Sequence, residues 1–171
     1  DDDDHHHHLP SCTREELETV IRWKFAKGKP RPLWKQIRSN SEEAVQKASQ
    51  LAFAKVTEGS GTHGEDETRV RAAMKEFTVL KGIGPASASA FISLYRPDLC
   101  IFMDDEVIEC LYEGKRGYTP KIYFDINAKC KGYAHMVGEG WTPRRIGKAL
   151  WTAARMSVSD EHEDLTLQHV H

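Results

Sequence analysis

The segment 80–107 reads LKGIGPASASAFISLYRPDLCIFMDDEV, and it decides the fold expected for this chain. Its first part places Gly82 and Gly84 on either side of one apolar residue, and Pro85 follows. Glycine reaches positive φ at little cost, and proline suits the first position of a helix. The pattern therefore predicts a tight hairpin that leads directly into a helix, with Ile83 as the apolar residue that seats the turn.

A hairpin of this kind predicts an anion site. Free backbone amides in the turn and the positive end of the helix dipole both favour a bound phosphate. Upstream, residues 68–78 carry apolar side chains at helical spacing, so the unit is expected to be helix, hairpin, helix. A plain corner between two helices is the alternative. The residues expected to bind a DNA phosphate are Lys81, Gly82, Ile83, Gly84 and Ala86.

The second part of the segment ends on two adjacent carboxylates, Asp104 and Asp105, where another helix is expected to begin. A fixed carboxylate next to a sugar can stabilise positive charge that develops there and can activate water. Aspartate is also a preferred helix cap, which contributes ~1 kcal/mol. Either aspartate can therefore cap the helix 106–111 while the other projects toward a ligand.

Residues 80–111 resemble the helix-hairpin-helix DNA glycosylase superfamily. The similar parts are LKGIGPASASA, for the family's hairpin, and FMDDEVI, for its aspartate segment. The chain looks like a divergent branch of that superfamily. The resemblance implies an all-α, helix-hairpin-helix DNA glycosylase-like domain that binds double-stranded DNA. It also implies that Asp105 is the catalytic residue of a base-excision enzyme.

The chain departs from the family pattern at several positions. Lys81 stands where the hairpin usually has proline, and Glu106-Val107 stands where Thr-His is frequent. The lysine that attacks the sugar in bifunctional members is Ala86 here, so the resemblance implies a monofunctional enzyme without a Schiff-base lysine. No cofactor or metal is expected, because the cysteines are too scattered for the iron–sulfur loop of some members. They are Cys12, Cys100, Cys110 and Cys130.

Length and composition indicate one globular domain. The chain has 171 residues with 39% hydrophobic content, enough for a real core. No apolar run approaches the ~20 residues of a membrane span, and no secretory signal is visible. The cysteines show no disulfide spacing, which favours an intracellular protein, nuclear in a eukaryote. We expect a monomer without a membrane partner.

The net charge of −2 conceals a basic middle. Eight of the 26 acidic residues lie at positions 1–4 and 160–164, where there is no lysine or arginine. The remainder has 24 basic against 18 acidic residues, a balance of +6, which suits a polyanionic partner such as DNA. The basic linker after residue 26 is expected to contact DNA through Lys27, Lys29, Arg31 and Lys35. The alternative is that this linker is only a solvated loop.

Three parts of the chain are expected: a low-complexity Asp/His segment at 1–12, the helical domain at 13–156 and a disordered acidic tail at 157–171. The domain begins at a capping box, Thr13 to Glu16. Pro120 and Pro143 each follow a threonine and predict two further helix starts. Three tryptophans are expected in the core, namely Trp23, Trp141 and Trp151.

Three functions are consistent with these observations. The first is a monofunctional DNA glycosylase-like base-excision repair enzyme, a hydrolase. The second is a non-catalytic helix-hairpin-helix module that only binds nucleic acid. The third is a helical protein-interaction domain in which the hairpin is a corner.

Overall fold

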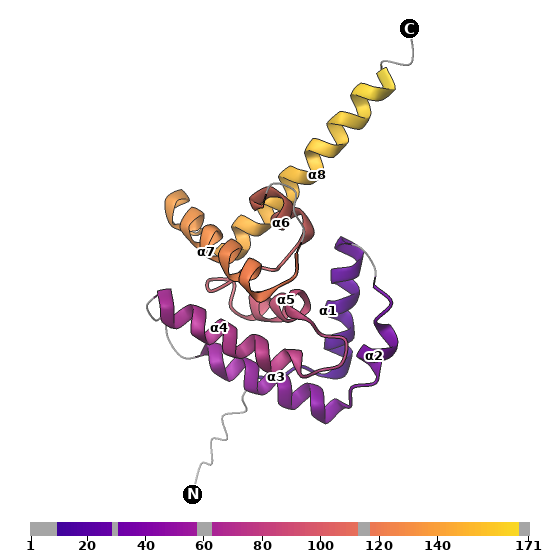
Figure 1. Cartoon of the computed structure of the whole chain (residues 1–171), viewed down its shortest axis with the longest axis vertical. Helices are drawn as coiled ribbons and strands as arrows, with labels where there is room; N and C mark the ends of the chain where they lie inside the picture. The colour runs from indigo at the N-terminus through magenta and orange to yellow at the C-terminus, as the bar shows by residue number, and fades with distance from the viewer. Residues whose placement is uncertain (1–9, 29–30, 58–62, 113–116, 168–171) are drawn as a thin grey trace, which may run out of the picture.

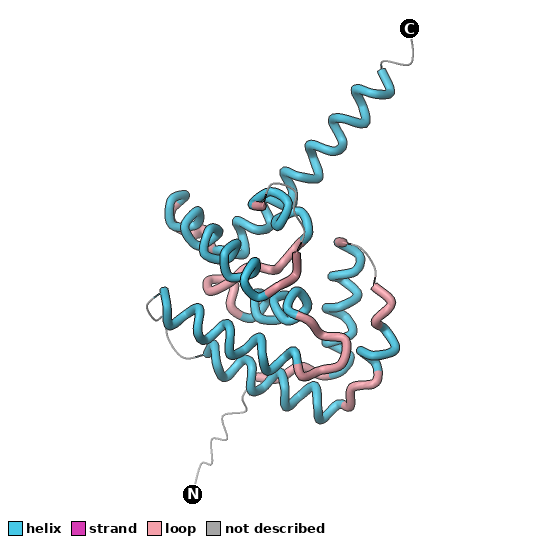
Figure 2. The backbone as a smooth tube through the Cα atoms, viewed as in Figure 1, coloured by secondary structure: helices cyan, strands magenta, loops and turns pink. Residues whose placement is uncertain are grey.

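The computed structural model describes residues 10–28, 31–57, 63–112 and 117–167, with side chains up to residue 157 in the last range. Within these ranges the chain forms α-helices and no β-strand, which confirms the all-α class (Figure 2). The helices are α1 (Arg14–Lys27), α2 (Trp34–Arg38), α3 (Glu42–Thr57), α4 (His63–Thr78), α5 (Pro85–Tyr95), α6 (Asp105–Leu111), α7 (Pro120–Val137) and α8 (Pro143–Leu167).

The predicted start of α1 is confirmed as a capping box. The Glu16 amide donates to the Thr13 hydroxyl at 3.1 Å, and the Thr13 amide donates to the Glu16 carboxylate at 2.8 Å. These two bonds satisfy amides that a helix start otherwise leaves open. α1 then buries Leu17, Ile21 and Phe25 on one face, as the spacing predicts.

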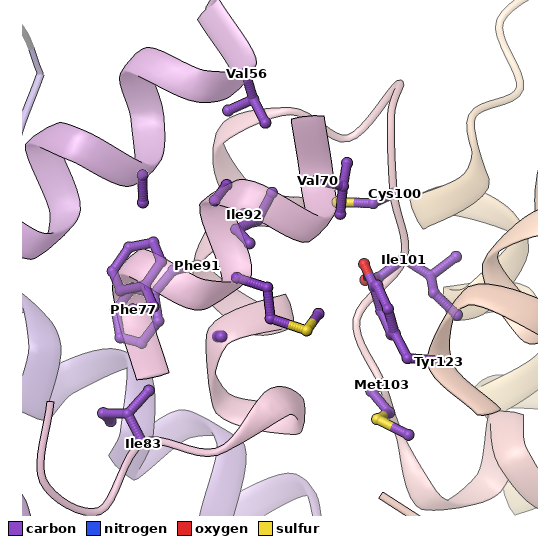
Figure 3. Packing of buried hydrophobic residues seen from close by; sticks show 14 of the residues in the cluster. Val56, Val70, Phe77, Ile83, Phe91, Ile92, Cys100, Ile101, Met103 and Tyr123 are labelled. Carbon is purple, nitrogen blue, oxygen red and sulfur yellow. The ribbon is translucent and has the colours of Figure 1, made fainter. Parts of the chain in front are cut away.

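The core is centred on α3, α4 and α5. α3 lies along α4, and α4 packs on α5 (Figure 1). The rings of Phe77 and Phe91 stack with centroids 4.9 Å apart and an interplanar angle of 22°. Figure 3 shows these rings face to face, with Ile83 at the same end of the cluster. The hairpin is therefore anchored by the apolar residue expected to seat it.

The extended segment between α5 and α6 is held on both sides by buried side chains. The Ile101 amide donates to the Asn127 side-chain oxygen of α7 at 2.9 Å, and the Met103 amide donates to the Ser89 hydroxyl of α5 at 2.9 Å. Buried backbone N–H groups outside helices and sheets need such side-chain partners for their hydrogen bonds. The two bonds fix the path of the chain immediately before Asp104.

The C-terminal helix is longer than predicted. α7 begins at the expected threonine cap, where the Ile122 amide donates to the Thr119 hydroxyl at 3.3 Å. α8 continues to Leu167, whereas a disordered acidic tail was expected from residue 157. No proline or glycine lies between 148 and 167 to end the helix, so the acidic composition alone did not predict its end. Figure 1 shows the last part of α8 projecting away from the other helices.

Candidate nucleic-acid and active site

The hairpin joins α4 to α5 with the geometry that the sequence predicts. Gly82 has a positive φ of 79°, and the Ile83 amide donates to the Leu80 carbonyl at 3.2 Å. Ile83 is 5% exposed. The turn therefore depends on a left-handed glycine and on a buried isoleucine.

The glycines of the hairpin have different roles. A Cβ on Gly82 would lie 2.8 Å from the Ile37 side chain, so the fold excludes a side chain there. Gly84 has φ −100°, is exposed, and would place a Cβ within 4 Å of no other atom. The fold does not require glycine at position 84. A ligand that approaches this backbone closely would require it, because a side chain would stand in its way.

A buried asparagine holds the hairpin from outside the motif. The Lys81 amide donates to Asn40 Oδ1 at 2.9 Å, and Asn40 Nδ2 donates to the Lys81 carbonyl at 3.0 Å. The backbone of Lys81 is thus already satisfied, and its predicted phosphate contact would have to come from the exposed side chain. This pairing joins the end of α2 to the hairpin.

The amino end of α5 faces a cavity. Gly84 is the N-cap and Pro85 follows it, and no side chain caps this end of the helix. Uncapped first-turn amides and the helix dipole favour an anion. The hairpin cavity, as we call it, has a volume of about 310 Å³. Its lining includes Gly82, Gly84, Ala86, Asp104, Asp105 and Tyr118.

The two aspartates have distinct surroundings. Asp104 occupies the N-cap position of α6, but its side chain makes no capping bond. It is buried, and its Oδ2 lies 2.6 Å from Lys27 Nζ. Asp105 is half-buried, and its Oδ1 accepts a hydrogen bond from the Tyr118 hydroxyl at 2.5 Å. Both line the hairpin cavity, so the predicted catalytic carboxylate faces the hairpin.

A tyrosine links Asp105 to the basic linker. Arg31 Nη2 donates to the Tyr118 hydroxyl at 3.3 Å, and its guanidinium carbon lies 5.6 Å from the ring centroid. Burial raises the pKa of Tyr118, and the bond to Asp105 raises it further. The phenol therefore keeps its proton and remains a donor to the carboxylate.

Lys24, a basic residue near the end of α1, also belongs to the site, although it is not among the expected DNA contacts. It lines the hairpin cavity together with Arg31. Burial lowers the pKa of Lys24, while the negative charge of Asp105 opposes that shift. The cavity thus combines carboxylates with cations, so its lining can pair with both anionic and cationic groups.

The predicted basic contacts with DNA fall in different places. Arg31 is exposed at the hairpin cavity, and Lys35 is exposed on α2. Lys29 lies outside the described residues. Lys27 is 17% exposed and bonded to Asp104, which favours an internal role over the predicted contact with a phosphate.

A second cavity adjoins the first. It has a volume of about 660 Å³ and lies between α1, α5 and α8. Trp23, Phe102 and Trp151 line it, and Asp104 and Phe102 also belong to the hairpin cavity. Trp23 and Trp151 were expected in the core but are half-buried at this cavity, and Trp141 is exposed. The pair Trp23/Lys27, four residues apart in one helix, is a sequence signal that could have pointed to this cavity.

Glu106 lies next to Asp104 and links α6 to α8. Its Oε1 is 2.6 Å from Arg155 Nη2, while its buried Oε2 has no hydrogen-bond donor among the described residues. Burial raises the pKa of Glu106 and the Asp104 carboxylate raises it further. A protonated Glu106 can supply the missing hydrogen by donating to Asp104.

Within the described side chains, no group of three or more histidine, cysteine or acidic residues is arranged to hold a metal ion. Across the part of the chain that the structure describes, no helix is both long and apolar enough to cross a membrane. Comparison of the sequence and the structure with protein-family models, curated proteins and solved structures finds no match.

Proposed function

We propose that this protein is a helix-hairpin-helix DNA-binding protein that acts as a monofunctional DNA glycosylase. The observation that carries the proposal is the hairpin cavity, in which Asp105 faces Gly82, Gly84 and Ala86. The sequence resemblance to the glycosylase superfamily supports it. A phosphate bound at the start of α5 would place one nucleotide of a duplex opposite the carboxylate.

Asp105 is proposed to act in two ways, as an electrostatic stabiliser of positive charge and as a general base. As the N-glycosidic bond breaks, its electron pair leaves with the base and positive charge develops on the sugar. The Asp105 carboxylate stabilises that charge and accepts a proton from the water whose oxygen bonds to C1′. The Tyr118 hydroxyl orients the carboxylate by its bond to Oδ1. The base must first leave the stack, which favours damaged or mispaired bases.

The monofunctional part of the proposal follows from Ala86, which offers no amine beside the hairpin. Lys24 is the amine that could replace the missing nucleophile, because it lines the same cavity and burial lowers its pKa. Strand cleavage that disappears in Lys24→Met would overturn the monofunctional assignment.

The test is release of bases from duplexes that carry uracil, alkylated or oxidised bases. We expect Asp105→Asn to reduce release about 10²–10³-fold, as loss of one transition-state stabiliser does. Asp125→Asn is the matched control, because Asp125 also accepts a bond from a tyrosine, Tyr112 at 2.8 Å, but is exposed on α7. No release from the whole panel, or equal release by Asp105→Asn and wild type, would overturn catalysis.

The second candidate is a module that binds DNA without catalysis. It is favoured by the part-buried Lys27–Asp104 ion pair, which gives Asp104, the neighbour of the proposed catalytic residue, a structural role. In that case Gly84→Asp weakens duplex binding, while Asp105→Asn leaves binding unchanged or improves it. Duplex affinity that does not fall with salt would argue against both candidates and favour the helical protein-interaction domain.

A further inference from the structure

The larger cavity, which we call the aromatic cavity, is built from three rings around one ammonium group. Lys27 Nζ lies 4.5 Å from the Trp151 ring centroid and 5.3 Å from those of Trp23 and Phe102. The same nitrogen is 2.6 Å from Asp104 Oδ2. An aromatic cage of this kind usually recognises a cationic ligand, but here the protein supplies the cation.

The other charges on the lining have the same sign. Arg144 and Lys148 join Lys27 on the wall of the aromatic cavity, against the single carboxylate of Asp104. Arg144 is also anchored, since its Nη1 donates to the Ser93 hydroxyl at 3.2 Å. The lining therefore carries three positive charges and one negative charge, and a cationic ligand would be repelled at short range.

The rest of the lining suits a flat ring. Trp23 comes from α1 and Trp151 from α8, so aromatic surface is offered by two helices. The volume of about 660 Å³ falls within the range of small-molecule sites. Lys27 has three N–H donors, one of which Asp104 engages, so the others can bond a hydrogen-bond acceptor such as a carbonyl oxygen.

We infer that the aromatic cavity binds an uncharged, carbonyl-bearing nucleobase and rejects bases that carry a fixed positive charge. The identification of the ligand as a nucleobase rests on the proposed function, whereas the selection against cations rests on the ring distances and the lining charges. If the protein excises bases, neutral oxidised or deaminated bases are then its substrates, and cationic N-alkylated bases are not.

The test uses the full-length protein and the matched nucleosides guanosine and 7-methylguanosine, at a pH where the second is cationic. Binding is followed by NMR through the indole N–H signals of Trp23 and Trp151, assigned with Trp→Phe variants. We expect guanosine to shift both signals and 7-methylguanosine to bind at least about tenfold more weakly, since three lining cations against one carboxylate repel a cationic base. Unmoved signals with guanosine, or equal binding of the two nucleosides, would overturn the inference.

Lys27→Met vacates the cage and removes one of the three lining cations, so the preference for guanosine over 7-methylguanosine should become smaller. If the unpaired Asp104 prevents folding, the double variant Lys27→Met/Asp104→Asn removes both charges of the pair, and its preference for guanosine should also be smaller than that of wild type, because the cage is vacant. Lys129→Met is the matched control, because Lys129 Nζ lies 4.8 Å from the Tyr112 ring, away from the cavity lining. A preference in the Lys27 variants as large as that of wild type would contradict the role of Lys27.

The two proposals fail separately. Nucleoside selectivity without base release from any duplex would leave a nucleoside-binding cavity and remove the glycosylase. Release of a cationic base from duplex DNA at the rate of neutral bases would keep the glycosylase and overturn the selectivity.

Discussion

At the scale of single residues, the two hairpin glycines make a sharp stability prediction. Gly82→Ala should lower the free energy of unfolding by at least about 1–2 kcal/mol, because φ is positive and Ile37 occupies the space of a Cβ. Gly84→Ala should change it by less than about 0.5 kcal/mol, because its φ is ordinary and the space is open. Chemical denaturation of both variants measures the difference. Equal destabilisation would mean that Gly84 is also structural.

Glu106 predicts a pH dependence of stability. Burial and Asp104 raise the pKa of Glu106, so the folded state keeps its proton at pH values where the unfolded chain has lost it. The unfolded state then binds fewer protons, and stability falls as the pH rises above the ordinary glutamate pKa. In Glu106→Gln this decline should be smaller.

Thermal unfolding between mildly acidic and neutral pH measures the effect of Glu106→Gln. Glu139→Gln is the control, because Glu139 is exposed in the turn between α7 and α8. A steeper decline in the Glu106 variant than in wild type would show that the Arg155 pair outweighs burial and Asp104.

At the scale of elements, the segment that leads into α6 explains how a short helix can place a functional carboxylate. Asn127 and Ser89 hold the backbone before it, so Asp104 reaches the N-cap position without its side chain being needed as a cap. The Asp104 side chain is then free to bond Lys27, and Asp105 lies one residue further, toward the hairpin cavity. The geometry of the site thus depends on a loop that is fixed by its neighbours.

The projecting end of α8 gives a prediction about an element. A chain that ends after Ser157 should keep its free energy of unfolding within about 0.5 kcal/mol, because Figure 1 shows the last turns leading away from the body. The removed residues contain four acids and no lysine or arginine, so duplex affinity should rise at low salt. Denaturation and a duplex titration measure the two effects. A large loss of stability would show that this end of α8 supports the fold.

At the scale of the whole molecule, the site is assembled from distant parts of the chain. Lys27 and Asp104 are 77 positions apart, Asn40 and Lys81 are 41 apart, and Arg155 donates to the Lys27 carbonyl across 128 positions. These contacts bring the end of α1, the hairpin and α8 to one place. A change in the Lys27–Asp104 contact is expected to act on both cavities, because Asp104 lines both.

The features that the sequence determined are local. Thr13 and Glu16 predict the start of α1, and Gly82, Ile83 and Pro85 predict the hairpin and the helix after it. Each depends on residues within a few positions of one another, whose backbone preferences and capping bonds act without the rest of the fold. The same local signals did not locate the end of α8, because acidic composition does not by itself end a helix.

Only the tertiary structure decided what each charged side chain does. Lys27 belongs to a basic linker in sequence, yet packing places it between three aromatic rings and Asp104. Asn40 lies between α2 and α3 in sequence, yet its side chain holds the hairpin. A partner that lies dozens of positions away is chosen by how the helices pack and by the need to satisfy buried charges and amides, which local spacing does not encode.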